Sequence, residues 1–88
     1  MLNINPHDAD AHFCMGFALL SMNRVSQAID RFRLGLQYKP DDSEARFGLG
    51  SALAAQGREE EAVAELKEAL RMNPNHYRAR QAIRQLGY

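Results

Sequence analysis

The chain has 88 residues, of which 45% are apolar and 25% are charged, and this composition is typical of a folded domain and too apolar for a disordered one. Eleven Lys and Arg residues balance eleven Asp and Glu residues, so the chain as a whole has no net attraction for nucleic acid or anionic membranes. The longest uninterrupted apolar run, residues 17–20, is too short to span a membrane, the N-terminus lacks a secretory signal and Cys14 has no cysteine partner, so we expect a cytoplasmic location.

The sequence repeats with a period of 34 residues. Pro6, Pro40 and Pro74 stand at this interval, and each ends a similar phrase in which a leucine and a large apolar residue keep their places. The same offset matches further pairs, among them Ala11 and Ala45, Phe13 and Phe47, Gly16 and Gly50, and Leu19 and Leu53. We therefore interpret residues 1–6 as the end of a preceding unit, 9–42 as one repeat and 43–76 as a second.

Each repeat is predicted to contain two helices. In the first repeat, a helix over residues 9–22 ends at Asn23, and a second helix ends before Pro40. In the second repeat, Asp41 or Asp42 caps a helix over 43–56, and Gly57 supplies the left-handed residue that ends it. Glutamates 59–61 then begin a helix that stops at Pro74, because acidic residues favour the positive end of a helix. One last helix over residues 77–86 completes an all-α chain of five helices.

This pattern resembles the tetratricopeptide repeat, a 34-residue helix-turn-helix unit with the motif W-x2-L-G-x2-Y, A-x3-F, P. The first repeat has the small residues and the proline of the motif, although His12 and Leu19 stand where tryptophan and tyrosine are usual. In the second repeat, Arg46 and Leu53 take these two places. The resemblance implies a helical solenoid whose repeats pack through Gly16, Ala28, Phe32, Pro40, Gly50, Ala62, Leu66 and Pro74.

The two ends of the predicted array differ. Residues 77–88 read as a capping helix, because Arg84 stands where the repeats have Gly16 and Gly50 and would obstruct another close-packed helix. The first helix has no such cover, so we expect an open apolar face formed by Ala11, Met15, Ala18 and Met22. The chain is then either a piece of a longer repeat protein or a domain in which something else covers this face.

The sequence gives no sign of catalysis, of a metal site or of a cofactor. His7 and His12 would point about 140° apart on a helix, and Cys14 has no general base nearby in the pattern. A solenoid this short also offers no enclosed pocket with a paired acid and base. We therefore expect that the chain is not an enzyme.

Tetratricopeptide repeats use the first helix of each repeat to hold peptides, and the resemblance carries this role to a predicted groove. For Phe13 and Phe47 we leave open a second interpretation, in which they fill the seam between neighbouring first helices. Family members that clamp acidic C-terminal tails have lysine and asparagine where this chain has phenylalanines and Ser51, so an apolar or amphipathic segment fits better. The predicted groove residues are Asp10, Phe13, Phe17, Leu20, Glu44, Phe47, Ser51, Arg78 and Gln81.

We accordingly expect a protein–protein interaction scaffold whose partner is a protein or a peptide. The alternative is a homo-oligomerisation module, for example a homodimer, that uses the open N-terminal face or the groove.

Overall fold

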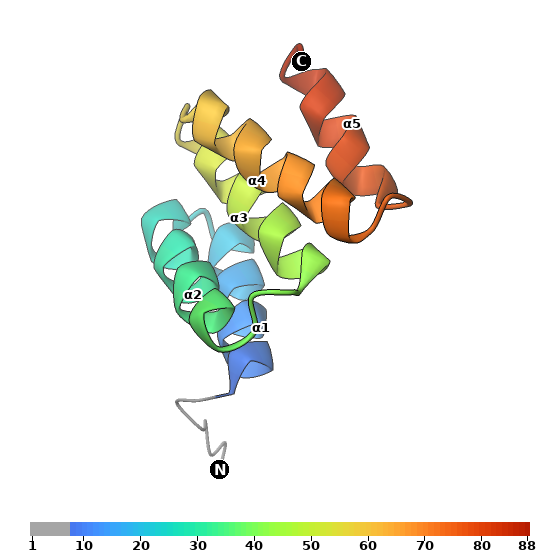
Figure 1. Ribbon diagram of the computed structural model, residues 1–88. Coiled ribbons are helices and arrows are strands. Elements are labelled where there is room, and N and C mark those ends of the chain that lie inside the picture. The colour runs from blue at the N-terminus through green and yellow to red at the C-terminus, as the bar shows by residue number, and fades with distance from the viewer. Residues whose placement is uncertain (1–7) are drawn as a thin grey trace.

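The computed structural model describes residues 8–88, so the interpretation of residues 1–6 as the end of a preceding unit lies outside the described residues. The described residues form five α-helices and contain no strand, which confirms the predicted all-α fold (Figure 1). The helices are α1 (Ala9–Ser21), α2 (Val25–Tyr38), α3 (Ser43–Ala55), α4 (Glu59–Met72) and α5 (Tyr77–Gln85).

The first helix of each pair and the final helix begin in the same way. The side chains of Asp8, Asp42 and His76, which are 34 residues apart, each accept a hydrogen bond from a backbone N–H three residues later. For His76 the acceptor is Nδ1, which lies 3.2 Å from the amide nitrogen of Ala79. These caps satisfy N–H groups that the first turn of a helix would otherwise leave unpaired.

The turns inside each pair need a residue with a positive φ angle. Asn23 has φ 61° between α1 and α2, and Gly57 has φ 79° between α3 and α4. Glycine and asparagine adopt this left-handed conformation at low cost, so both helices can reverse direction within a few residues. The predicted turn residues are therefore correct.

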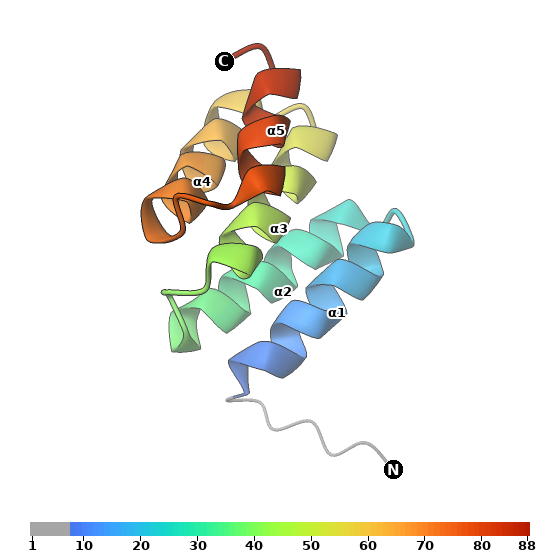
Figure 2. The same ribbon diagram turned by 90° about the vertical axis from the view of Figure 1, so that its right-hand side faces the viewer.

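The helices form two layers. Helices α1, α3 and α5 lie side by side, since α1 contacts α3 and α3 contacts α5, while α2 and α4 pack against these helices from the other side (Figures 1 and 2). Helices α2 and α4 are more widely separated, although the side chains of Arg33 and Glu61 approach each other at 3.8 Å. The array therefore bends toward the layer of α1, α3 and α5, which we call the inner layer.

The aromatic ring of Phe32 joins three helices. The side chain is fully buried, and it lies against the backbones of both Gly16 on α1 and Gly48 on α3. A methyl group on Gly16 would lie 2.9 Å from Cζ of Phe32, and one on Gly48 would lie 2.5 Å from the same atom. The ring can occupy this place only because both positions lack a side chain.

Some of the predicted repeat-packing residues are buried and others are exposed. Ala28, Ala62 and Leu66 are fully buried, whereas Pro40 and Pro74 are exposed in the turns that link one pair to the next. Gly50 lies against Leu66 and the carbonyl oxygen of Ala62, as expected. Gly16 differs, because its nearest neighbours are ring atoms of Phe32 and not Ala28.

Polar contacts replace the aromatic residues that the family motif usually has within each pair. Nη1 of Arg31 lies 3.4 Å from Nδ1 of His12 and thereby links α2 to α1. At the corresponding places in the second pair, Nη1 of Arg46 donates to Glu65 at 3.0 Å. Both links are partly buried, so they tie the helices together without a tryptophan.

We predict that Gly50→Leu destabilises the protein by about 1–3 kcal/mol. A methyl group at this position would lie 2.8 Å from Cγ of Leu66 and 3.1 Å from the carbonyl oxygen of Ala62, so a leucine must push α3 and α4 apart. Urea unfolding followed by circular dichroism measures the change. The matched control is Ala64→Leu, an exposed position on α4, which should stay within about 0.5 kcal/mol of the parent. Equal stability of Gly50→Leu and the parent would contradict the assigned helix crossing.

We also predict that His76→Ala is less stable than His76→Asn by about 1 kcal/mol. Both variants lose the ring, but asparagine keeps a side-chain acceptor for the amide of Ala79 and alanine does not. The same unfolding measurement gives the difference between the two variants. If they were equally stable, the histidine would not serve as the cap of α5.

Candidate functional site

The inner layer is the surface on which the resemblance places ligand binding. All nine predicted groove residues belong to α1, α3 or α5. The structure brings some of them together in one cluster, buries two of them and leaves the rest partly or fully exposed.

Phe13 and Phe47 are not available on the surface, because their side chains are only 5% and 8% exposed. Their inclusion among open groove residues is therefore wrong, and the alternative, in which they fill the seam between neighbouring first helices, fits Phe47 but not Phe13. Phe13 packs within its own helix pair and not between first helices, since a methyl group on Gly35 of α2 would lie 2.4 Å from Cε1 of Phe13.

The two phenylalanines occupy equivalent repeat positions but pack differently. In the second pair the residue that corresponds to Gly35 is Ala69, which is fully buried. A methyl group thus stands in the second pair at the position where Gly35 leaves room for the ring of Phe13 in the first pair. Phe47 accordingly lies under α5, where it contacts the ring of His76 at a centroid distance of 5.2 Å.

Glu44, Phe47, His76 and Arg78 form a cluster between α3 and α5. The guanidinium of Arg78 lies 4.6 Å from the centroid of the Phe47 ring, which is a cation–π contact. One carboxylate oxygen of Glu44 lies 2.8 Å from Nε2 of His76, and the other lies 4.0 Å from Nη1 of Arg78. The first contact is at ion-pair distance but is not aligned as a hydrogen bond, because Nε2 has no hydrogen-bond partner.

Sequence reasoning missed His76 as a member of this cluster. The residue stands 34 positions after Asp42, and this spacing marks it as the cap of α5. The burial of His76, at 5% exposure, could not be read from the sequence because it depends on how α5 packs over Phe47.

Phe17, Leu20 and Ser51 are half-buried, so part of each side chain remains open to a ligand. The ring of Phe17 meets the ring of Phe32 edge-on at a centroid distance of 4.9 Å, and Leu20 packs against the same core. Ala54, half-buried on α3, also packs against this core. These residues form a modest apolar strip on α1 and α3.

Asp10 and Gln81 are exposed at the edges of the inner layer. Nζ of Lys39 donates to the carboxylate of Asp10 at 3.4 Å, and this hydrogen bond, with the negative charges of Asp10 and Asp42, raises the pKa of Lys39 above its ordinary value. Nε2 of Gln81 donates to the hydroxyl oxygen of Tyr77 at 3.4 Å. Because both contacts are exposed to solvent, they add little stability and leave the groups open to exchange with a ligand.

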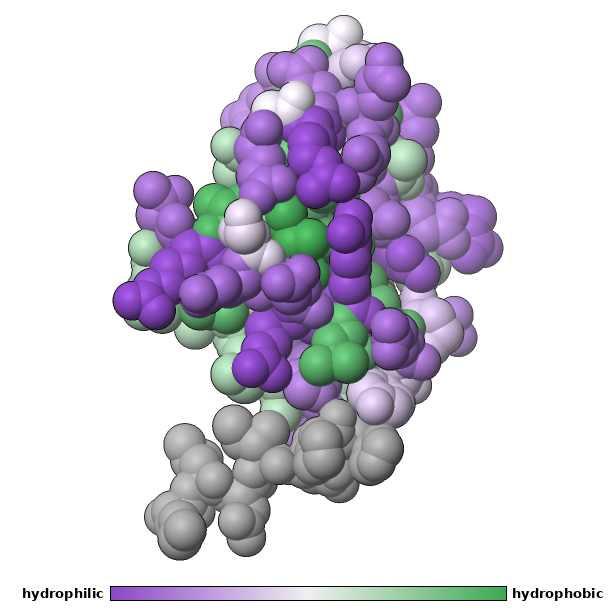
Figure 3. Space-filling model, turned by 90° about the vertical axis from the view of Figure 1, so that its left-hand side faces the viewer, coloured by the Kyte–Doolittle hydropathy of each residue, from purple (hydrophilic) through white to green (hydrophobic). Residues whose placement is uncertain are grey.

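One hollow lies between α1 and α2, away from the predicted groove residues. It has a volume of about 500 Å³ between α1 and α2 and is lined by Met15, Leu19, Gln27, Asp30, Arg31 and Leu34. None of these residues belongs to the predicted groove. Figure 3 shows the molecule from the side of α2, where hydrophobic side chains are visible between hydrophilic ones.

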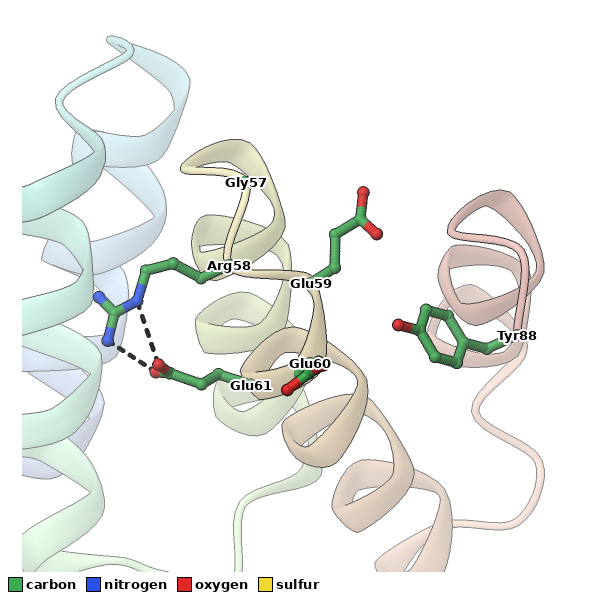
Figure 4. A pocket seen from close by; sticks show the side chains of 6 residues that line it. All are labelled: Gly57, Arg58, Glu59, Glu60, Glu61 and Tyr88. Carbon is green, nitrogen blue, oxygen red and sulfur yellow. Dashed lines mark hydrogen bonds and ion pairs between the residues drawn. The ribbon is translucent and has the colours of Figure 1, made fainter.

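Another hollow, of about 410 Å³, lies between the start of α4 and the C-terminal residue Tyr88. Figure 4 shows that Glu61 points toward Arg58, and Nη2 of Arg58 lies 2.6 Å from its carboxylate, while Glu59 extends between α4 and Tyr88. The acidic side chains here favour the positive end of α4, which accounts for them without a ligand.

Within residues 8–88, no group of three or more His, Cys, Asp and Glu side chains could hold a metal ion. The same part of the chain has no helix with both the length and the apolarity needed to cross a bilayer.

Comparisons with known proteins agree with this architecture. A family model described as tetratricopeptide repeat matches residues 15–77, which is more than half of the chain. None of the curated proteins matches the sequence.

Two solved structures share the fold at low sequence identity. The crystal structure of MamA has a TM-score of 0.89 and 21% identity over 93% of this chain and 48% of that chain. The first tetratricopeptide repeat domain of Spaghetti (RPAP3), bound to the HSP90 peptide SRMEEVD, has a TM-score of 0.92 and 19% identity over 94% of this chain and 66% of that chain. This chain thus spans about half of the first protein and about two thirds of the second.

The helix pairs, their 34-residue period and the family model lead to one conclusion. The chain belongs to the tetratricopeptide repeat family, whose members are generally non-enzymatic interaction scaffolds.

Proposed function

We propose that the chain is a protein–protein interaction scaffold that holds an apolar or amphipathic polypeptide segment on its inner layer. The observation that carries this proposal is the strip of half-buried apolar side chains formed by Phe17, Leu20 and Ala54, while the charged pair Glu44 and Arg78 lies at the starts of α3 and α5. Membership of the tetratricopeptide family supports a polypeptide partner, because the family model and a structural neighbour with a bound peptide point to the same kind of ligand.

The chemistry of the inner layer favours apolar contacts along the strip and polar contacts at the starts of α3 and α5. Apolar side chains of a ligand gain from leaving water at Phe17 and Leu20, and a charged or amide group can reach Glu44 or Arg78. Arg78 is already held over Phe47, so its guanidinium is partly fixed in place before a ligand arrives.

The acidic peptide seen on the structural neighbour fits this surface poorly. The resemblance implies that the lysines and asparagines that hold acidic tails in such relatives would stand where this chain has Phe13, Phe17, Phe47 and Ser51. Phe13 and Phe47 are moreover buried. Arg78 is the one predicted groove residue with a positive charge at neutral pH, and it lies near the carboxylate of Glu44. A segment with several acidic residues would therefore meet more negative than positive charge at this place.

The experiment is a selection of peptides from a displayed random library on the immobilised 88-residue chain, followed by fluorescence titration of the selected peptide. We expect an apolar-rich, amphipathic peptide whose affinity falls at least tenfold in Ser51→Arg, because the new side chain covers the middle of the inner layer. The matched control is Ala64→Arg on α4, an exposed position in the other layer, which should bind as the parent does. Equal loss in both variants, or loss in neither, would contradict the proposed surface.

A second prediction concerns the peptide SRMEEVD. We expect its dissociation constant for this chain to be at least tenfold weaker than that of the selected amphipathic peptide, since the cations that would neutralise its carboxylates are missing. Titration of both peptides at the same ionic strength makes the comparison. Tighter binding of SRMEEVD would overturn the preference for an apolar segment.

A further inference from the structure

Four residues of α1 form an apolar row that no described helix covers: Ala11, Cys14, Met15 and Ala18, which we call the open row. Cys14 and Ala18 are exposed, and Ala11 and Met15 are half-buried. One turn further along, the side chain of Met22 is 58% exposed. The 500 Å³ hollow between α1 and α2 lies beside this row and shares Met15 with it.

The same row occurs twice more in the molecule, and both times a helix covers it. Adding 34 to each residue number gives Ala45, Gly48, Leu49 and Ala52 on α3, all of which are buried. These residues pack with Ile29, Phe32 and Leu36 of the preceding helix α2. Adding 34 once more gives a row on α5, which packs with Leu66, Ala69 and Leu70 of α4. This row consists of Ala79, Ala82, Ile83 and Leu86.

We propose that the open row and the adjoining hollow dock an amphipathic helix that lies outside residues 8–88, in the position that α2 takes on α3. This surface is separate from the inner layer, so the inference does not depend on the function proposed above. The two covered rows define the general shape of the occupant, a helix with apolar residues spaced by three and four. Residues that differ between the three rows define its particular chemistry.

Cys14 limits the size of the occupant's central side chain. Its counterpart on α3 is Gly48, where even a methyl group would lie 2.5 Å from Cζ of Phe32. Its counterpart on α5 is Ala82, which packs with a cluster that contains the smaller side chain of Leu66. A cysteine is larger than both, so the occupant must carry an alanine or another small residue where α2 carries Phe32.

Met22 and Gln27 change the polar contacts at the edge of the docking surface. The counterpart of Met22 in the second repeat is Gln56, which donates to the hydroxyl oxygen of Ser26 at 2.9 Å. The counterpart of Gln27 is Glu61, whose carboxylate lies 3.8 Å from the guanidinium of Arg33. The exposed methionine favours an apolar residue where α2 has Ser26, because a hydroxyl there would lose water without gaining a partner. The neutral Gln27 removes the reason for an arginine at the place of Arg33.

These differences also argue against a second copy of this chain docked in the same register. Helix α2 carries Ser26, Phe32 and Arg33, all three of which mismatch the open row. Its apolar face is moreover already buried against α3, and the corresponding face of α4 is buried against α5. The occupant is therefore a helix of different sequence.

The test measures the binding of two peptides to the intact 88-residue chain. A side-chain cross-link on the solvent-facing side of each peptide keeps it helical. One has the sequence of residues 25–38, and the adapted peptide carries Ser26→Leu, Phe32→Ala and Arg33→Gln. Methyl NMR of the methionines reports binding, with Met15 and Met22 at the site and Met72 at the far end of α4 as the internal control. The alkylation rate of Cys14 gives a second readout, because a docked helix shields the thiol.

We expect the adapted peptide to shift the signals of Met15 and Met22 but not that of Met72, to slow alkylation of Cys14, and to bind at least tenfold more tightly than the unadapted peptide. Ala18→Glu should weaken its binding at least tenfold, because a charge would then lie within the open row. Ala55→Glu changes another exposed alanine, at the end of α3, and should leave the affinity unchanged.

Equal affinity of the two peptides, or no shift at Met15 and Met22, would overturn the proposed docking site. Concentration-dependent shifts of these methionines without any peptide, with sedimentation showing a dimer, would also overturn it in favour of a second copy as the occupant. The effect of Ser51→Arg on binding of the selected peptide concerns only the inner layer and does not depend on these outcomes. The proposed function and the proposed docking site can therefore be refuted separately.

Discussion

The placement of one ring, that of Phe32, decides how the helices are arranged. The ring lies against Gly16 on α1 and Gly48 on α3, and Phe17 meets it edge-on. Because the ring fills the space between two glycine backbones, α2 must lie close to both neighbouring helices at once. This contact sets the position of the second helix pair relative to the first. The bend of the inner layer follows from that relative position.

The packing of α2 on α3 is repeated by α4 on α5, and the docking surface on α1 is recognised from this repetition. Since α2 covers an apolar row on α3 and α4 covers the matching row on α5, the same row on α1 can be recognised as a docking surface. The step from α3 to α5 differs in detail, because Ala69 replaces Gly35 and sends the ring of Phe47 under His76 and Arg78. Phe13 and Phe47 are thus both buried, but Phe47 also lies beneath a charged cluster.

Much of the fold was predictable from the sequence, because it depends on local chemistry. The prolines at a 34-residue spacing, the aspartate caps and the turn residues Asn23 and Gly57 each act within a few residues of the chain. The candidate site was predictable only in part. Whether Phe13 and Phe47 face a ligand depends on residues of other helices, Gly35 in one case and His76 in the other, and no periodicity within α1 or α3 contains that information.

A nuclear Overhauser experiment on the ring protons of Phe32 tests most directly whether this ring lies between Gly16 and Gly48. We expect strong cross-peaks from these protons to the α-protons of both Gly16 and Gly48, and the ring current should shift the glycine signals. Cross-peaks to Gly16 alone would mean that α2 does not hold α3 in the described position. The equivalence of the three rows, and with it the docking surface on α1, would then be contradicted.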